Sequence, residues 1–176
     1  NNVLPTSAQT ANLRDVPRSR KNLGTQLFFT CCQLQTTEGE SVSAINFGQS
    51  FRIHTEITSI ETSWQDLSIV VGIDAIDDTR ITTAASEETH TFFSISPDQP
   101  LSVNIDFSDL ILQPGIYFIT LGVRSGARGL DQVMRCAKIE VTDIAIQGIV
   151  PPSGTPGFLR AQPAWHHSKE MVTKIA

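Results

Sequence analysis

The chain has 176 residues, 40% of them hydrophobic, and a net charge of -5. This length favours one domain with tails, which can bury enough surface to fold without disulfides or a structural metal. The acidic balance argues against nucleic acid as the main partner, and no apolar run approaches the roughly 20 residues of a membrane-spanning helix.

Residues 1–21 are polar and carry several basic side chains, among them Arg14, Arg18 and Arg20, with no period of 2 or 3.6 residues. Such a composition is typical of a linker. Because the chain opens on Asn1 and shows no signal peptide, we expect it to be a fragment of a longer protein.

Short β-prone segments separated by turn signals follow the linker. Leu101–Phe107 has the cleanest alternation of apolar and polar residues, and Phe51–Thr58 alternates in the same way. The predicted strands are 27–32, 51–58, 67–76, 80–85, 101–107, 116–123 and 137–141. No segment has the pattern of an amphipathic helix. The sequence therefore predicts an all-β, immunoglobulin-like or jelly-roll antiparallel β-sandwich over residues 22–147.

A stiff spacer rich in Pro and Gly, residues 148–157, follows the predicted domain. Residues 158–176 then form a C-terminal strand and tail, with the strand itself over residues 158–167. A strand on such a tether can pair within its own chain or on a neighbouring copy, so the sequence allows strand exchange.

The sequence lacks the motifs of the common enzyme classes: it has no phosphate-binding loop, no nucleophile elbow and no zinc-protease helix. Neighbours on a strand point to opposite faces, so His166–His167 is a poor metal site. The acidic pairs Asp77–Asp78 and Glu87–Glu88 fit solvated turns. We expect no catalytic residue, no metal and no cofactor.

The three cysteines, Cys31, Cys32 and Cys136, form a poor disulfide framework because they are odd in number and two of them are adjacent. We expect reduced thiols in a cytosolic setting, packed as small apolar side chains.

Two predicted strands carry a glycine in the row of side chains that faces away from the core. A glycine inside a strand weakens it unless something approaches the backbone closely. If the two strands are neighbours, Gly72 and Gly122 make a shallow trough. Its rims are Asp74, Phe118, Thr120 and Arg124.

This trough suits a sugar, because Phe118 offers a stacking face and the polar groups of Asp74, Thr120 and Arg124 can bind hydroxyls. An equally weighted alternative is that Phe118 packs under a loop or a second subunit, and that the glycines only ease the strand twist.

Several motifs follow one another in a familiar order. They are Asn22–Thr25, Phe47–Ile53, Val70–Asp77, Leu112–Tyr117 and Leu121–Val123. Over residues 22–142 the chain resembles the C-terminal domain of Wzt, the nucleotide-binding subunit of bacterial O-antigen polysaccharide ABC exporters. One departure is the turn at Asp77–Thr79, which lacks the glycine associated with it.

The resemblance implies a non-catalytic carbohydrate-binding domain that recognises the nonreducing, often modified, terminus of an O-antigen polysaccharide for export. It also implies a homodimer with an exchanged C-terminal strand, and the exporter's ATPase and transmembrane subunits as partners. Residues 1–21 would then be the linker from an ATPase domain absent from this chain. The location would be cytoplasmic, peripheral to the inner membrane through the transporter.

Two other functions stay open. One is a structural dimerisation or protein-interaction sandwich without glycan binding, in which the outward face is an interface. The other is a glycan-modifying enzyme, which would need a cluster of ionisable groups that the sequence does not display.

Overall fold

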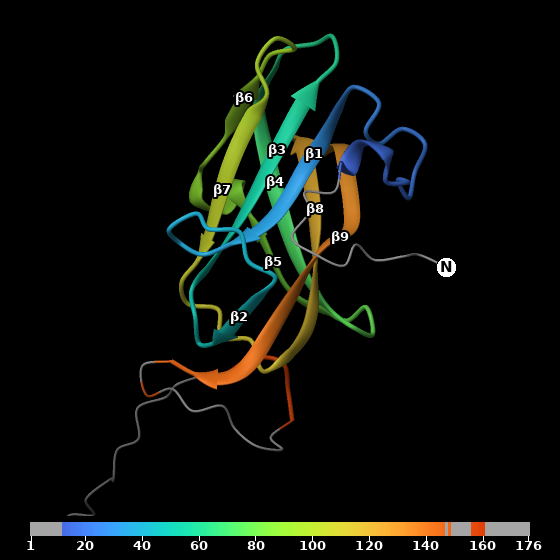
Figure 1. Ribbon diagram of the computed structural model, residues 1–176. Helices are drawn as coiled ribbons and strands as arrows, with labels where there is room; N and C mark the ends of the chain where they lie inside the picture. Colours follow the sequence, from blue (N-terminus) through green and yellow to red (C-terminus); the bar gives the residue numbers. More distant parts are fainter. Residues whose placement is uncertain (1–11, 147, 149–155, 161–176) are drawn as a thin grey trace, which may run out of the picture.

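The computed structural model describes residues 12–146, 148 and 156–160 (Figure 1). A short 3-10 helix, η1 (Leu13–Asp15), precedes the strands, and a second, η2 (Ser86–Thr89), follows β5. The strands are β1 (Leu27–Gln35), β2 (Ala44–Phe47), β3 (Phe51–Ser59), β4 (Trp64–Ala75), β5 (Arg80–Ala85), β6 (Phe93–Ile95), β7 (Leu101–Phe107), β8 (Gly115–Ser125) and β9 (Arg128–Ala145).

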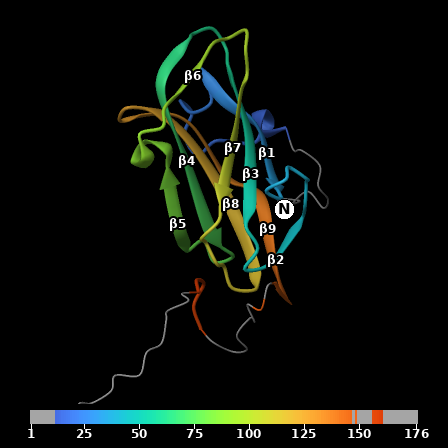
Figure 2. The ribbon, with the colours of Figure 1, turned by 90° about the vertical axis from the view of Figure 1, so that its left-hand side faces the viewer.

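The strands form two sheets, which Figures 1 and 2 show from two sides. The smaller sheet has the order β1-β3-β7, and the larger has the order β2-β9-β8-β4-β5 with β6 attached to β4. The predicted all-β sandwich is confirmed. Its pairing is antiparallel except between β2 and β9, which are parallel.

The core lies between the sheets and follows the period of 2 that the sequence displays. In β3, Phe51, Ile53 and Ile57 are fully buried, and Phe51 stacks on Phe107 of the neighbouring strand with 5.1 Å between ring centroids. The inward rows of β4 and β8 are buried in the same way: Ile69, Val71, Ile73, Ala75, Tyr117, Ile119, Leu121 and Val123.

The structure differs from the prediction mainly in β9, which is far longer than residues 137–141. Ile119 of β8 pairs with Ala137, but Leu121 pairs with Val133, so β9 bulges between these two pairs. Arg135, inside the bulge, has a φ of 52°. A bulge breaks the alternation of faces, which hides the strand from a search for period 2. The short strands β2 and β6 are also absent from the predicted strands.

Residues 12–21, predicted as part of a linker, pack on the sandwich. Leu13 is 1% exposed and belongs to the main core cluster. The assignment of residues 1–21 as the connector to an ATPase domain stays a prediction, and residues 1–11 lie outside the described residues.

All three cysteines are free thiols. Burial raises the pKa of the Cys31 thiol. A hydrogen bond with Cys136, together with burial, raises the pKa of Cys32. A thiol with a raised pKa stays protonated at neutral pH and is a poor nucleophile, so Cys31 and Cys32 act as packing side chains.

Near the C-terminus, Phe158–Arg160 pairs with residues 111–113 of the same chain through an isolated bridge between Leu112 and Leu159. The Gln113 N–H donates to the Phe158 carbonyl at 2.8 Å, and the Arg160 N–H donates to the Ile111 carbonyl at 2.9 Å. The rest of the predicted terminal strand, including His166–His167, lies outside the described residues.

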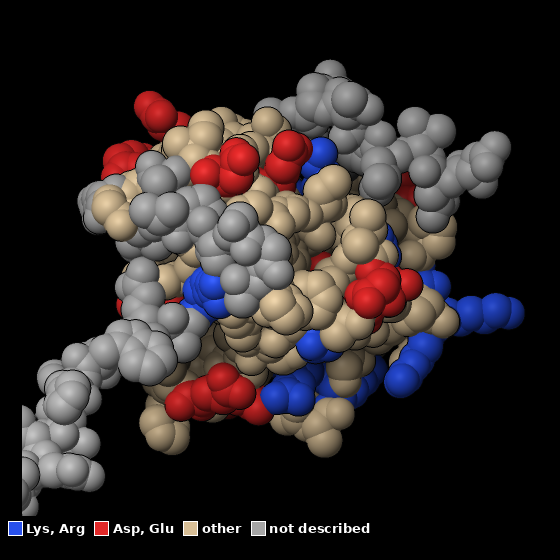
Figure 3. Space-filling view, turned by 90° about the horizontal axis from the view of Figure 1, so that it is seen from below, with Lys and Arg blue, Asp and Glu red and all other residues tan. Residues whose placement is uncertain are grey.

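The surface carries both signs of charge. Groups of acidic and groups of basic side chains alternate around the end of the molecule seen in Figure 3. Among the residues that the structure describes, no helix has the length and apolar character that crossing a membrane requires.

Candidate functional site

The two glycine-bearing strands, β4 and β8, are direct neighbours. Their antiparallel register places Gly72 opposite Thr120 and Val70 opposite Gly122. Residues opposite one another in a sheet share a face, so both glycines lie in one outward patch. This is the adjacency on which the predicted trough depends.

A hollow of about 290 Å³ lies over this patch, and we call it the β4–β8 hollow. Four of the six predicted site residues line it: Gly72, Thr120, Gly122 and Arg124. The other polar or charged lining residues carry no local sequence signal that predicts them; they are Arg20, Arg80, Asp131 and Gln132. Asp74 and Phe118 lie on the same two strands but do not line the hollow.

The space over the two glycines differs: Arg80 occupies it at Gly72, and it is open at Gly122. A β-carbon on Gly72 would come within 2.5 Å of the Arg80 guanidinium carbon, so this glycine lets Arg80 lie across the strand. A β-carbon on Gly122 would meet only Val70 and the Asp131 carbonyl, at 3.7 and 3.9 Å. Those are ordinary contacts, so the space over Gly122 is open.

Asp74 holds Arg80 in place rather than facing solvent. It is 6% exposed and accepts hydrogen bonds from Arg80 Nε and, at 2.6 Å, from the Thr120 hydroxyl. The predicted hydroxyl-binding roles of Asp74 and Thr120 are therefore taken up by protein partners. The group that they present to the hollow is the Arg80 guanidinium.

Phe118 is buried, and this corrects the expectation that its ring is an open stacking platform. Its side chain is 3% exposed, and the Arg135 guanidinium lies 3.8 Å from the ring centroid. The bulge in β9 aims Arg135 across the ring, and Asp78 pairs with its far end. A sugar ring cannot reach the face that Arg135 covers.

The turn that positions Asp78 forms without the glycine noted as absent. Asp78 adopts a φ of 66°, a conformation that Asp tolerates better than most side chains. The Asp78 N–H donates to the Ala75 carbonyl at 3.1 Å, and the Thr79 N–H donates to Asp77 Oδ1.

Arg124 keeps hydrogen-bonding capacity at the rim of the hollow. Its Nη2 donates to Glu87 of η2, whereas its Nε is buried and has no acceptor among the described residues. Its side chain is 39% exposed. This guanidinium can therefore donate to an oxygen-rich ligand without breaking up the core.

One wall of the hollow comes from the N-terminal segment, held by a buried ion pair between Arg18 and Asp131. Arg18 Nε and Nη2 donate to the two carboxylate oxygens at 2.7 and 2.9 Å. The same carboxylate accepts from the backbone N–H groups of Phe29 and Gln132. With Arg18 fixed there, Arg20 and Leu23 line the hollow.

The arrangement suits the binding of an oxygen-rich ligand. Guanidinium groups donate to hydroxyl or anionic oxygens, and the one carboxylate in the lining, Asp131, is already occupied by four donors. Among the described residues no group of three His, Cys, Asp or Glu side chains is placed to hold a metal ion.

Known proteins match the chain over most of its length. The family model described as the Wzt C-terminal domain matches residues 26–152. A solved structure titled as the crystal structure of the C-terminal domain of Wzt is 12% identical, with a TM-score of 0.58, covering 86% of this chain and 99% of that chain. No curated protein sequence matches the chain.

Two weaker structural matches follow. A Pseudomonas fluorescens alkylpurine DNA glycosylase bound to DNA is 12% identical, covering 66% of this chain and 30% of its own, with a TM-score of 0.42. A CARDB domain from Pyrococcus furiosus in complex with di-metal ions is 10% identical, covering 70% and 95%, with a TM-score of 0.41. Neither score is high enough to bear on this chain.

The buried ion pair gives a testable prediction. Asp131→Asn leaves the Arg18 guanidinium, whose side chain is 8% exposed, without a charged partner. We expect the free energy of unfolding, measured by urea denaturation, to fall by about 3 to 5 kcal/mol. Asp106→Asn is the control, because the Arg52–Asp106 pair has the same bidentate geometry with a half-exposed carboxylate. Equal losses in the two variants would contradict the role of Asp131.

Proposed function

The chain belongs to the Wzt C-terminal domain family, and from that premise we propose that it is a non-catalytic carbohydrate-binding domain. It recognises the nonreducing, often modified, terminus of an O-antigen polysaccharide and admits the polymer to export by an ABC transporter. The ATPase of that transporter belongs to a part of the protein outside this chain. The membership itself supports a carbohydrate-binding role in O-antigen export.

The β4–β8 hollow is the proposed place of binding. The observation that carries this is the open space over Gly122, in the middle of a strand, with guanidinium groups of Arg80 and Arg124 at its sides. Missing side chains let a ring lie close to the sheet, and the guanidinium groups donate to its oxygens. Asp74 holds the Arg80 guanidinium from within the sheet, and the Thr120 hydroxyl donates to the same carboxylate.

Membership of the family also supports a proposal for the partners of this domain. The domain works beside the exporter's ATPase and transmembrane subunits, in the cytoplasm and peripheral to the inner membrane. It also forms a homodimer. We propose that the pairing of Phe158–Arg160 with residues 111–113, seen here within one chain, can form between two copies with the same backbone hydrogen bonds.

Arg124 tests the place of binding. Arg124→Ala should raise the Kd for the O-polysaccharide of the source bacterium by about tenfold, the loss of one or two charged hydrogen bonds, as measured by isothermal titration calorimetry. Glu87→Ala is the matched control, because it removes the same ion pair while leaving the guanidinium. The site is wrong if both variants bind like the unaltered chain, or if both lose affinity equally.

The C-terminal segment tests the dimer. A chain ending at Gly148 should sediment as a monomer, whereas the full chain should sediment as a dimer, because the removed segment supplies the exchanged strand. Circular dichroism of the shortened chain checks that the sandwich is kept. A dimer that survives the truncation would rule out exchange of this strand.

A further inference from the structure

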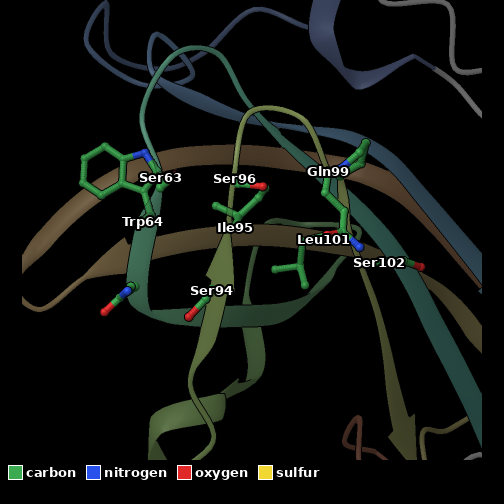
Figure 4. Close-up of a pocket in the computed structure, with 10 residues that line it drawn as sticks. Ser63, Trp64, Ser94, Ile95, Ser96, Gln99, Leu101 and Ser102 are labelled. Carbon is green, nitrogen blue, oxygen red and sulfur yellow. The ribbon is translucent and has the colours of Figure 1, made fainter.

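A second hollow lies at the end of the sandwich where the chain crosses from one sheet to the other. β6 pairs with β4 in the larger sheet, β7 pairs with β3 in the smaller, and an isolated bridge joins Ser96 to Gln99 between them. The space enclosed is about 630 Å³, within the range of small-molecule sites. We call it the β6–β7 pocket (Figure 4).

Its lining contains no charged residue. The polar members are Ser63, Gln65, Ser94, Ser96, Gln99 and Ser102, and the remainder are apolar. In Figure 4 the side chains come from β4 on one side, from β6 in the middle and from the start of β7 on the other. A ligand there would meet hydroxyl and amide groups from three strands.

Strand geometry explains the run of serines. Ile95 is 5% exposed and faces the core, so its neighbours Ser94 and Ser96 face the other way. The partner strand is irregular here, because the pairing shifts between Trp64 and Leu67. Asp66, in that irregularity, has a φ of 55°. Bulges of this kind re-aim side chains and are common next to binding sites.

Trp64 supplies an independent observation. Its indole Nε1 is buried and has no acceptor among the described residues. A buried indole N–H ordinarily finds one, so this group is an exception that calls for a reason. A hydroxyl oxygen in the adjoining pocket is an acceptor of the kind that it lacks.

The chemistry of this lining fits a neutral sugar. Hydroxyl and amide groups both donate and accept, as sugar hydroxyls do, and Leu101 offers apolar surface to the C–H groups of a ring. The Arg128 guanidinium lies over the Trp64 ring, 5.7 Å from its centroid, so one face of that ring is already occupied. Because no charged side chain lines the pocket, an anionic group would lose its water there without meeting the charged donors that line the β4–β8 hollow. The β4–β8 hollow differs, since arginines line it.

We propose that the β6–β7 pocket is a second saccharide site, which takes neutral sugar units from the interior of the polymer whose terminus binds at the β4–β8 hollow. The choice of that polymer rests on the proposed function, whereas the preference for a neutral saccharide rests on the pocket alone. Two sites on one chain raise the apparent affinity for a long polymer beyond that of either site.

The test is ¹⁵N NMR titration of the full chain with methyl glycosides of glucose, galactose, mannose and N-acetylglucosamine, and then with the O-polysaccharide. We expect the Trp64 indole and Gln99 side-chain signals to shift with at least one glycoside. Gln99→Ala combined with Ser102→Ala should raise the Kd at this pocket by about tenfold. Both side chains are exposed, so the fold should hold.

Two controls separate this site from the first. Gln33→Ala with Ser41→Ala removes an exposed Gln–Ser pair elsewhere and should leave the Trp64 shift unchanged. Gly122→Val fills the β4–β8 hollow and should also leave the Trp64 shift with methyl glycosides unchanged.

The outcomes separate the two claims. If the polysaccharide shifts Gly122 but no probe shifts Trp64 or Gln99, the second site is overturned and the proposed function stands. Shifts at Trp64 without any at Gly122 would support the pocket and refute binding at the hollow. If no signal shifts at either place, both claims are overturned. If the Gln99→Ala and Ser102→Ala double variant shows the same shifts as the unaltered chain, only the second site is overturned.

Discussion

The register between β4 and β8 is the constraint on which the rest of the site depends. With Gly72 opposite Thr120, both inward rows are apolar and buried while both glycines face outward. A slip of one residue would turn every side chain of a strand to the other face. The buried row therefore fixes where the missing side chains lie, and the core creates the hollow on the opposite surface.

The walls of the hollow depend on ion pairs between residues far apart in the chain. Asp131 of β9 binds Arg18 of the N-terminal segment, and Asp74 binds Arg80 across the turn from β4 to β5. In each pair the carboxylate is buried and satisfied, so the acidic partner is structural. Arg80 and Arg124 are the basic groups that we propose contact the ligand.

The fold could be predicted because it depends on the alternation of apolar and polar residues along each strand, which is a local feature of the sequence. Leu101–Phe107 and Phe51–Ser59 display it plainly, and both are strands. β9 was missed in part because the bulge at Arg135 interrupts its period, and β2 and β6 were missed because they are too short to show one. The parallel pairing of β2 with β9 has no signature in either strand.

Only those site residues whose direction follows from strand alternation could be predicted. Face alternation along a strand predicts which way a side chain points. It therefore predicts four residues that line the hollow: Gly72, Thr120, Gly122 and Arg124. Phe118 points the same way, but its cover by Arg135 depends on a bulge in another strand. Arg20 and Asp131 line the hollow because Arg18 forms an ion pair with Asp131, over a hundred positions away in the chain. No local sequence pattern predicts this contact.

The central claim is that a polysaccharide terminus lies against the bare backbone of Gly122. The most direct measurement is the intermolecular nuclear Overhauser effect between the Gly122 α-protons and a bound oligosaccharide taken from the nonreducing end of the O-antigen. The account predicts contacts from these protons to the C–H groups of the terminal sugar. Contacts confined to the three-stranded sheet, with none at Gly122, would contradict it.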